Sequence, residues 1–221
     1  SKTQTFAVPL FYQQDINQHT RLAVWKIEED ASFFLQKVIL KREITHPHKR
    51  LQHLAGRYLL GYLFPDFPSE LIEIADTRKP FLPNEAFHFS ISHCGDFAAA
   101  IVSATESVGI DVEIVTPRVE KIKHKFLHPD ELQMVDAATM DRIQLLTLLW
   151  SAKEAMFKWW ARGDVDFSEV LRIWQMPDKL QGKINTSFQK NEIDIALQLD
   201  YRLMNELTLC WVNSKYSGIE E

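Results

Sequence analysis

Residues 145–162 have the pattern of one long helix that is apolar around most of its circumference. Asp141 precedes this segment as a candidate N-cap and Gly163 follows it, which is the usual composition of a helix start and end. A helix with so little polar surface belongs inside a protein. One polar stripe nevertheless recurs along it at steps of three or four residues, formed by Thr147, Ser151, Glu154, Lys158 and Arg162.

The charged residues of this polar stripe need partners. Burying Glu154 and Lys158 with nothing charged opposite them would be costly. The ordinary interpretation of a Glu and a Lys four positions apart is an ion pair on a surface helix. The aromatic and aliphatic bulk around the stripe favours a second interpretation, in which the stripe faces a polar cleft.

Composition is typical of a globular protein with a sizeable core. The 221 residues are 46% hydrophobic and 25% charged, and a net charge of −5 gives no overall basic field for nucleic acid. Two cysteines, Cys94 and Cys210, are too few for a disulfide framework and are not spaced as zinc ligands. Because no apolar run could span a bilayer and no signal-peptide layout is visible, we expect a cytoplasmic protein without membrane or nucleic-acid partners.

Hydrophobic periodicity predicts the same order of elements twice. Besides the long helix, helices are expected over 31–40, 47–63, 119–126 and 130–137. Strands are expected over 21–27, 71–75, 87–92, 97–102, 108–114, 170–176, 182–188, 193–199 and 207–212. Helices followed by a meander of strands, twice over, predict an α+β fold of two similar halves, residues 1–105 and 106–221, each with a long helix packed on an antiparallel sheet.

Asp111 and Glu113 are the first candidates for chemistry. They lie two residues apart in an expected strand, so their carboxylates share one face and can reach one cation. An exposed strand face with alternating acids is the ordinary alternative, but Gly109 on the same face leaves space beside them. Glu154 on the polar stripe would supply a third oxygen ligand. Mg²⁺ typically takes one or two carboxylates and completes its shell with water and substrate phosphate oxygens.

Basic residues are distributed in a way that suits a substrate with several phosphates. They are Arg42, Lys49, Arg50, Arg57, Lys79, His93 and Lys158. For Arg42 and Lys49 we expect no more than a solvated surface charge. Lys79 lies on a proline-bracketed loop and His93 begins a tight turn, so both are expected at the rim of a cleft.

Five segments, in order along the chain, resemble the signatures of 4′-phosphopantetheinyl transferases. Val-Gly-Ile-Asp-Val-Glu at 108–113 and Trp-Ser-Ala-Lys-Glu-Ala-Met-Phe-Lys at 150–158 resemble (V/I)GID(V/I)E and W(S/T)xKEAxxK, about forty residues apart. Residues 79–83, 89–93 and 126–131 resemble the family's GKPxxP loop, FNISHS segment and FxxxE stretch. The length resembles that of the larger, monomeric, surfactin-synthetase-activating type, which is a pseudodimer of two α+β halves.

This resemblance implies a reaction and its partners. The enzyme would transfer the 4′-phosphopantetheine arm of coenzyme A to a serine of an apo acyl or peptidyl carrier protein and release 3′,5′-ADP. By match, Asp111, Glu113 and Glu154 would hold Mg²⁺ in the cleft between the halves. Lys158 would contact the phosphates, and Glu154, or a water that it holds with Asp111, would take the proton from the carrier serine.

The resemblance also assigns residues to the nucleotide end of coenzyme A, and to its 3′-phosphate especially. These are Arg57, Lys79, Pro80, Ser92 and His93, with Lys158 reaching the phosphates. Glu131 matches a family acid of less defined role.

The chain departs from the family pattern at several positions. Arg78 stands where the family usually has Gly, Ser90 replaces Asn, and Cys94 replaces Ser, which leaves the detailed coenzyme A contacts open. Residues 162–164 depart from a GxGL pattern, which leaves the carrier preference open. Two other functions fit part of the pattern: a Mg²⁺-dependent nucleotide phosphohydrolase, and a catalytically inactive module that binds coenzyme A or a carrier protein.

Overall fold

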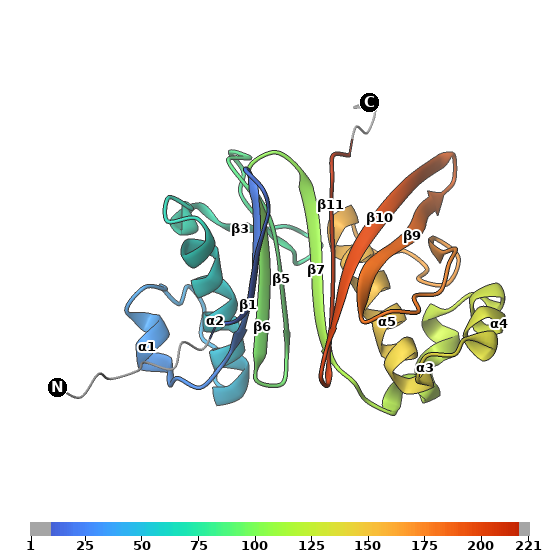
Figure 1. The fold of residues 1–221 in the computed structure, drawn as a ribbon. Helices are drawn as coiled ribbons and strands as arrows, with labels where there is room; N and C mark the ends of the chain where they lie inside the picture. Colours follow the sequence, from blue (N-terminus) through green and yellow to red (C-terminus); the bar gives the residue numbers. More distant parts are fainter. Residues whose placement is uncertain (1–9, 217–221) are drawn as a thin grey trace.

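The first part of the chain folds into a four-stranded antiparallel sheet with helices on one face (Figure 1). The computed structural model describes residues 10–216. The strands of this sheet are β1 (Leu10–Asn17), β2 (Thr20–Lys26), β5 (His88–Cys94) and β6 (Phe97–Ser103), in the spatial order β1-β2-β6-β5. The other elements are α1 (Ala31–Leu35), α2 (Pro47–Leu63), a 3₁₀ helix (Ser69–Leu71) and a ribbon of β3 (Glu73–Ile74) and β4 (Pro80–Phe81).

The second part forms a five-stranded antiparallel sheet whose outer face is covered by one long helix, with two shorter helices packed against that helix (Figure 1). Its strands are β7 (Ser107–Ile114), β8 (Leu171–Ile173), β9 (Gln181–Lys190), β10 (Ile193–Met204) and β11 (Leu207–Ser214), in the order β7-β11-β10-β9-β8. Its helices are α3 (Arg118–Phe126), α4 (Pro129–Ala137) and α5 (Arg142–Trp160). Antiparallel sheets combined with helices agree with the predicted α+β class.

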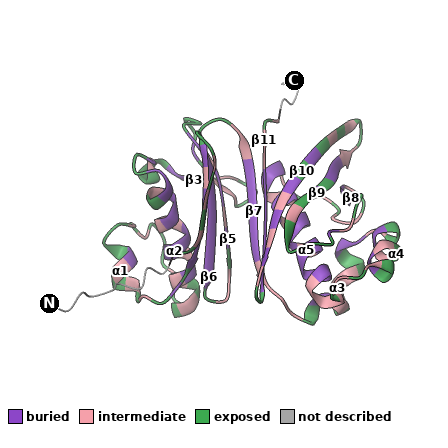
Figure 2. Ribbon diagram, viewed as in Figure 1, coloured by how far each residue is buried: buried purple, intermediate pink, exposed green. Residues whose placement is uncertain are grey.

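Buried residues lie on the facing surfaces of these layers (Figure 2), and their side chains form three groups. One lies between α2 and the first sheet and includes Leu59. A second lies between α5 and the second sheet and includes Met156. The third lies between the two sheets and includes Leu22, Ile101 and Ile110. Because Ile110 faces the first sheet, the residues that alternate with it on β7 face α5.

The helix α5 begins where the sequence predicts and ends slightly earlier. Asp141 is its N-cap, with a carboxylate oxygen that accepts a hydrogen bond from the Gln144 main-chain N–H at 3.0 Å. The helix ends at Trp160 because Ala161 adopts the left-handed conformation, with a φ of 62°. Gly163 therefore lies in the following loop and does not terminate the helix. Within residues 10–216, no helix has both the length and the apolar character needed to cross a membrane.

The helix α2 has the predicted bounds. Pro47 occupies its first turn, where the missing N–H costs nothing because helix starts leave their N–H groups unpaired. The His46 side chain accepts a hydrogen bond from the Lys49 main-chain N–H at 3.3 Å and caps the start. This helix therefore presents a fixed face to the first sheet.

Three predicted elements are shorter than expected, including the strand predicted over 170–176, which is only β8, and the periodicity does not predict β1, β4 or the 3₁₀ helix. The helix predicted over 31–40 ends at Leu35, and Val38 and Leu40 pack against the core from the following loop, while Leu35 and Ile39 are exposed. The strand predicted over 71–75 is only β3, with Leu71 and Ile74 both exposed. Strand β1 is largely polar, so it carries no strong apolar alternation.

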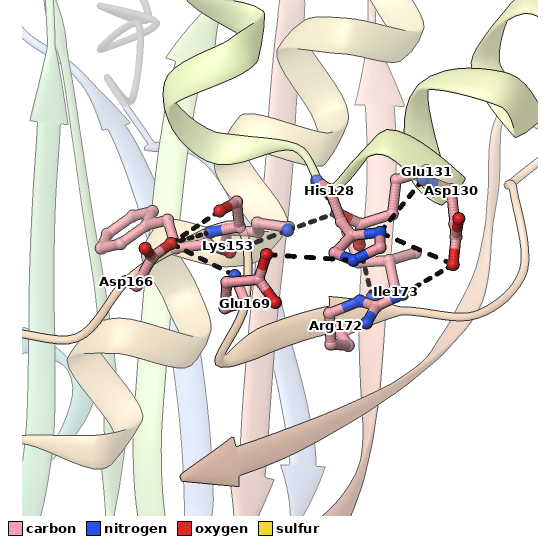
Figure 3. Close-up of polar contacts among 10 residues, drawn as sticks. His128, Asp130, Glu131, Lys153, Asp166, Glu169, Arg172 and Ile173 are labelled. Carbon is pink, nitrogen blue, oxygen red and sulfur yellow. Dashed lines mark hydrogen bonds and ion pairs between the residues drawn. The ribbon is translucent and has the colours of Figure 1, made fainter.

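A buried ion pair ties α4 and α5 to β8 (Figure 3). Lys153 Nζ lies 2.6 Å from Glu131 Oε1, and both side chains are fully buried. The Glu131 carboxylate also accepts main-chain N–H groups of His128 at 2.8 Å and Ile173 at 2.7 Å, while Lys153 donates to the Phe167 carbonyl oxygen at 2.8 Å. Burial lowers the pKa of Lys153 to about 8, and Glu131 opposes this shift. Glu131 is thus engaged within the fold and lies outside the candidate site.

Candidate active site

Two serine hydroxyls join the edge strands β5 and β7 where the sheets meet. Ser90 Oγ accepts a hydrogen bond from the Ile110 main-chain N–H, and Ser92 Oγ accepts one from the Val112 N–H, each at 3.1 Å. Both serines are buried, whereas Phe89 packs toward α2, so the predicted alternation of this strand is confirmed. The two sheets share no backbone ladder in the described structure, so side chains make this junction.

Asp111 is the buried acid at the centre of the junction, with a side chain that is 4% exposed. Its Oδ1 accepts hydrogen bonds from Ser92 Oγ and from Lys158 Nζ, each at 3.1 Å. Among the described residues, its Oδ2 has no hydrogen-bond partner. A buried carboxylate oxygen without a partner is costly, so Oδ2 is available to a cation or to a donor of a ligand.

Glu113 and Glu154 lie in the electrostatic field of Asp111. Burial, followed by the negative charge of Asp111, raises the pKa of Glu113 to about 9. The same two causes raise the pKa of Glu154 to about 7, and Lys158 opposes both shifts. Carboxyl groups shifted in this way are typical of sites that bind a cation or exchange a proton. In the described part of the chain, however, no three His, Cys, Asp or Glu side chains gather closely enough to hold a metal ion by themselves.

Gly109 allows α5 to lie directly on β7. A Cβ atom at this position would lie 2.0 Å from the Ala155 main-chain oxygen and 2.8 Å from the Trp159 nitrogen. The expected open space beside the acids is therefore filled by the helix backbone, and that expectation is wrong. The close approach brings Ser151 against the strand, where its hydroxyl donates to the Asp111 main-chain oxygen at 3.2 Å.

Lys158 and Lys79 connect α5 to the rest of the site. Lys158 Nζ donates to the Ile110 main-chain oxygen at 3.1 Å in addition to the Asp111 carboxylate. Lys79 Nζ, from the loop that leads into β4, donates to the Lys158 main-chain oxygen at 2.6 Å. This carbonyl lies in the last turn of α5, where carbonyl groups have no partner within the helix. Burial and the charge of Lys158 lower the pKa of Lys79 to about 8.

A cavity of about 560 Å³, called here the basic cavity, opens beside Lys158. Five of the six residues predicted to bind coenzyme A line it, namely Arg57, Lys79, Pro80, His93 and Lys158. Ser92 does not line it, because its buried hydroxyl is engaged by Asp111 and Val112. All of the charged residues that line the cavity are basic. Lys158 therefore lies between this cavity and Asp111.

Sequence reasoning missed three residues of the basic cavity: Arg42, His53 and Arg78. Arg42 was expected only as a surface charge, and it is exposed as well as lining the cavity. Burial, followed by the charges of Arg57, Arg42 and His93, lowers the pKa of His53 to about 4. The spacing of His53 and Arg57, one turn apart on α2, is the signal that could have identified the histidine.

The two ends of the polar stripe on α5 do not reach the site. Thr147 is buried and its hydroxyl donates to the Ile143 carbonyl oxygen of the same helix at 2.8 Å. Arg162 lies beyond the helix end, with its guanidinium 5.0 Å from the ring centre of Trp160 and 4.4 Å from that of Tyr216. The expectation of one continuous polar seam is therefore wrong at both ends. The middle of the stripe does contact β7, through hydrogen bonds from Ser151 and Lys158.

Comparison with known proteins bears on this arrangement. A family model described as the 4′-phosphopantetheinyl transferase superfamily matches residues 107–211. The comparisons therefore support a relationship between this chain and that superfamily. The matched segment is a little under half of the 221 residues, begins at β7 and includes Asp111, Glu113, Glu154 and Lys158.

Curated relatives of this superfamily align over a similar share of the chain. Enterobactin synthase component D of Salmonella austin is 33% identical over 111 residues, which cover 50% of this chain and 47% of that protein. The same component of Escherichia coli (strain K12) is 32% identical over 113 residues, covering 50% and 54%. The 4′-phosphopantetheinyl transferase AcpT of Escherichia coli O157:H7 is 29% identical over 122 residues, covering 54% and 62%. The aligned part thus spans about half the length of these relatives.

Proposed function

We propose that this protein is a Mg²⁺-dependent 4′-phosphopantetheinyl transferase. Coenzyme A is its substrate, a serine of an apo acyl or peptidyl carrier protein is the acceptor, and 3′,5′-ADP is released. One observation carries the proposal: the basic cavity reaches the buried carboxylate of Asp111 through a single residue, Lys158. Phosphoryl transfer depends mainly on positioning and on neutralising charge, and this arrangement offers both to a substrate with several phosphates. The superfamily match supports the same reading.

The acids at the junction fit a magnesium ion. Asp111 Oδ2 is buried without a hydrogen-bond partner in the described structure, and burial, followed by the negative charge of Asp111, raises the pKa values of Glu113 and Glu154. Mg²⁺ usually needs only one or two protein carboxylates together with substrate phosphates. We assign Asp111, Glu113 and Glu154 as its ligands, and we expect these three carboxylates, which do not gather closely enough without the ion, to approach one another when it binds. When bound, the ion supplies neutralisation of charge on the pyrophosphate oxygens.

Lys158, Glu154 and Asp111 are the proposed catalytic residues. The ammonium of Lys158 contacts the phosphates and stabilises the charge that develops on the leaving 3′,5′-ADP. Glu154 has a pKa of about 7, which suits a group that takes the proton of the carrier serine, directly or through a water held with Asp111. The serine oxygen forms a bond to the phosphorus of the phosphopantetheine phosphate as the bond to the ADP oxygen breaks.

The nucleotide end of coenzyme A is assigned to the basic cavity. Arg57, Lys79, Pro80 and His93 line it and can surround the phosphates, the 3′-phosphate included. Ser92 takes a different role from the one implied by the resemblance. Its hydroxyl bonds both the Val112 N–H and Asp111 Oδ1, so it positions the metal ligand and does not contact the nucleotide.

We also infer the larger, surfactin-synthetase-activating type, a monomeric pseudodimer of halves 1–105 and 106–221. Support comes from the presence of one long helix on an antiparallel sheet in each half, α2 and α5. Ser92 and Lys79 from the first half both contact residues of the second half at the site. The catalytic arrangement therefore requires both halves. The ends of the two halves, 1–9 and 217–221, lie outside the described residues.

A carrier-modification assay tests this function against its alternatives. The purified protein is incubated with coenzyme A, Mg²⁺ and an apo carrier protein, and the carrier is weighed by mass spectrometry. We expect a mass gain equal to one phosphopantetheine. Phosphate release without that gain would favour a nucleotide phosphohydrolase. Binding of coenzyme A or carrier without either product would indicate an inactive binding module.

A further inference from the structure

The turn between β3 and β4 has a backbone conformation that normally requires glycine. The Ala75 carbonyl oxygen accepts a hydrogen bond from the Arg78 N–H at 2.8 Å, and the Ala75 N–H donates to the Lys79 oxygen at 2.9 Å. Arg78 has a φ of 68°. Hairpin turns of this length place a left-handed residue at this point, and glycine is the default there because a Cβ atom would crowd the backbone. A glycine is also what the family pattern has at this position.

The Arg78 side chain does not compensate for this strained backbone by contacts inside the protein. It is exposed, and it lines the basic cavity. Within residues 10–216 its guanidinium group is found in no ion pair and no hydrogen bond. The strain is therefore not explained by the packing of the side chain, which leaves its position at the cavity as the feature that an arginine adds.

Arg78 joins a cavity in which positive charges already repel one another. Burial, followed by the charge of Arg42, lowers the pKa of Arg57. Two other cations that line the cavity already have hydrogen-bond acceptors within the protein. Lys79 donates to the main-chain oxygen of Lys158, and Lys158 donates to the Asp111 carboxylate. The guanidinium of Arg78 is thus a donor that an anionic ligand can use.

We propose that Arg78 binds a phosphate group of the nucleotide substrate. A guanidinium group can donate two parallel hydrogen bonds to a phosphate, which a backbone glycine cannot replace. The inference rests on the proposed function and deepens it, since it adds to the basic cavity a contact that the family pattern lacks. The 3′-phosphate and the pyrophosphate of coenzyme A offer the same chemistry and are the two sources of this group.

Two substitutions separate the charge of Arg78 from its backbone conformation. Arg78→Gly removes the cation and relieves the turn, so we expect the KM for coenzyme A to rise about tenfold and the unfolding midpoint to rise by roughly 2–4 °C. Arg78→Lys keeps the charge but loses the two parallel donors, so its KM should rise by less than that of Arg78→Gly, by about threefold. An unchanged KM in Arg78→Gly overturns the proposal. So does a loss in Arg78→Lys as large as that in Arg78→Gly.

The choice of substrate identifies the phosphate and isolates this inference from the proposed function. If Arg78 binds the 3′-phosphate, the rise in KM caused by Arg78→Gly disappears when 3′-dephospho-coenzyme A is the substrate. If Arg78 binds the pyrophosphate, the rise in KM is the same with both substrates. Either result supports the contact. A parent protein that transfers phosphopantetheine while Arg78→Gly matches it overturns this inference alone. A parent protein that neither binds coenzyme A in calorimetry nor transfers the arm overturns the proposed function, and this inference with it.

Discussion

Lys79 Nζ lies 2.6 Å from the main-chain oxygen of Lys158, so a loop of the first part of the chain caps the helix that carries Lys158. The ammonium lies at the end of α5 where unpaired carbonyl groups and the helix dipole concentrate negative charge. Because Lys79 also lines the basic cavity, one side chain both borders the ligand space and fixes the end of the helix. The two parts of the chain are therefore coupled at the site itself.

Replacing Lys79 with methionine should lower activity through the position of Lys158. Without the cap, the last turn of α5 is less fixed, and small displacements of a reacting group cost up to about 100-fold in rate. We expect kcat/KM for carrier modification in Lys79→Met to fall by about 10- to 100-fold. The control is Lys49→Met, which removes an exposed charge on α2. Similar kcat/KM values in the two variants would contradict the role of this contact.

Replacing Asp111 with asparagine should remove the response to Mg²⁺. The substitution preserves the size of the side chain but removes the charge that the buried Oδ2 offers to a cation. We expect transfer to fall by about 100- to 1,000-fold and the residual rate to be independent of Mg²⁺ concentration. Circular dichroism should show an intact fold, and the exposed Asp66→Asn serves as the control. A parent-like Mg²⁺ titration curve would refute the metal assignment.

Replacing Arg57 with alanine should weaken the binding of coenzyme A more than the binding of 3′-dephospho-coenzyme A. Arg57 lines the basic cavity and is assigned to the 3′-phosphate, a contact that the shorter substrate cannot make. We expect the KM for coenzyme A to rise about tenfold, with a clearly smaller rise for the dephospho form. The matched control is Arg118→Ala, on the exposed start of α3. Equal losses for both substrates would rule out the 3′-phosphate role.

The buried pair of Glu131 and Lys153 should matter for stability. Glu131→Gln leaves the fully buried ammonium of Lys153 without its countercharge, so the free energy of unfolding should fall by about 3–5 kcal/mol. Urea denaturation measures this change. The exposed Glu192→Gln should shift it by less than about 0.5 kcal/mol. A parent-like unfolding curve for Glu131→Gln would show that the pair carries little of the stability.

His53 should make the protein less stable in mild acid. Its pKa is lowered from 6.5 to about 4 in the folded state, so the unfolded chain binds more protons between these values. The free energy of unfolding therefore falls as the pH drops from 6.5 to 4, by less than the full pKa difference would give, because this side chain is only half-buried and solvent screens it. His53→Gln should flatten the decline between pH 7.5 and pH 4.5 in urea denaturation. The exposed His19→Gln should leave the decline unchanged.

The parts of the fold that repeat over many residues could be predicted from the sequence. The period of α5 and the alternation along β7 correctly indicated a buried helix and a strand whose acids face it. The shorter elements could not be predicted, because the end of a helix such as α1 depends on contacts with residues that are distant in the sequence.

The contacts at the site depend on which strand edges meet, and no local pattern specifies that. Ser92 could be associated with a ligand from its segment, but its bond to Asp111 requires β5 and β7 to be adjacent. Lys79 donates its hydrogen bond to a main-chain oxygen, and no pattern of side chains in the sequence predicts such a partner. The left-handed backbone conformation of Arg78 was not predicted either, although an arginine where the family pattern has glycine was an indication of it.

The absence of a side chain at Gly109 fixes where α5 lies on β7, whereas other residues shape the ligand space. The backbone of α5 packs directly on β7, which holds the Ser151 hydroxyl against the Asp111 main-chain oxygen and the Lys158 ammonium against the Asp111 carboxylate. Arg57 and Arg78 of the basic cavity come instead from α2 and the β3–β4 turn, while Lys79 of the same turn bonds the α5 backbone. Substitutions at Arg57 or Arg78 can therefore alter the ligand space while Gly109 and Lys79 keep α5 in place.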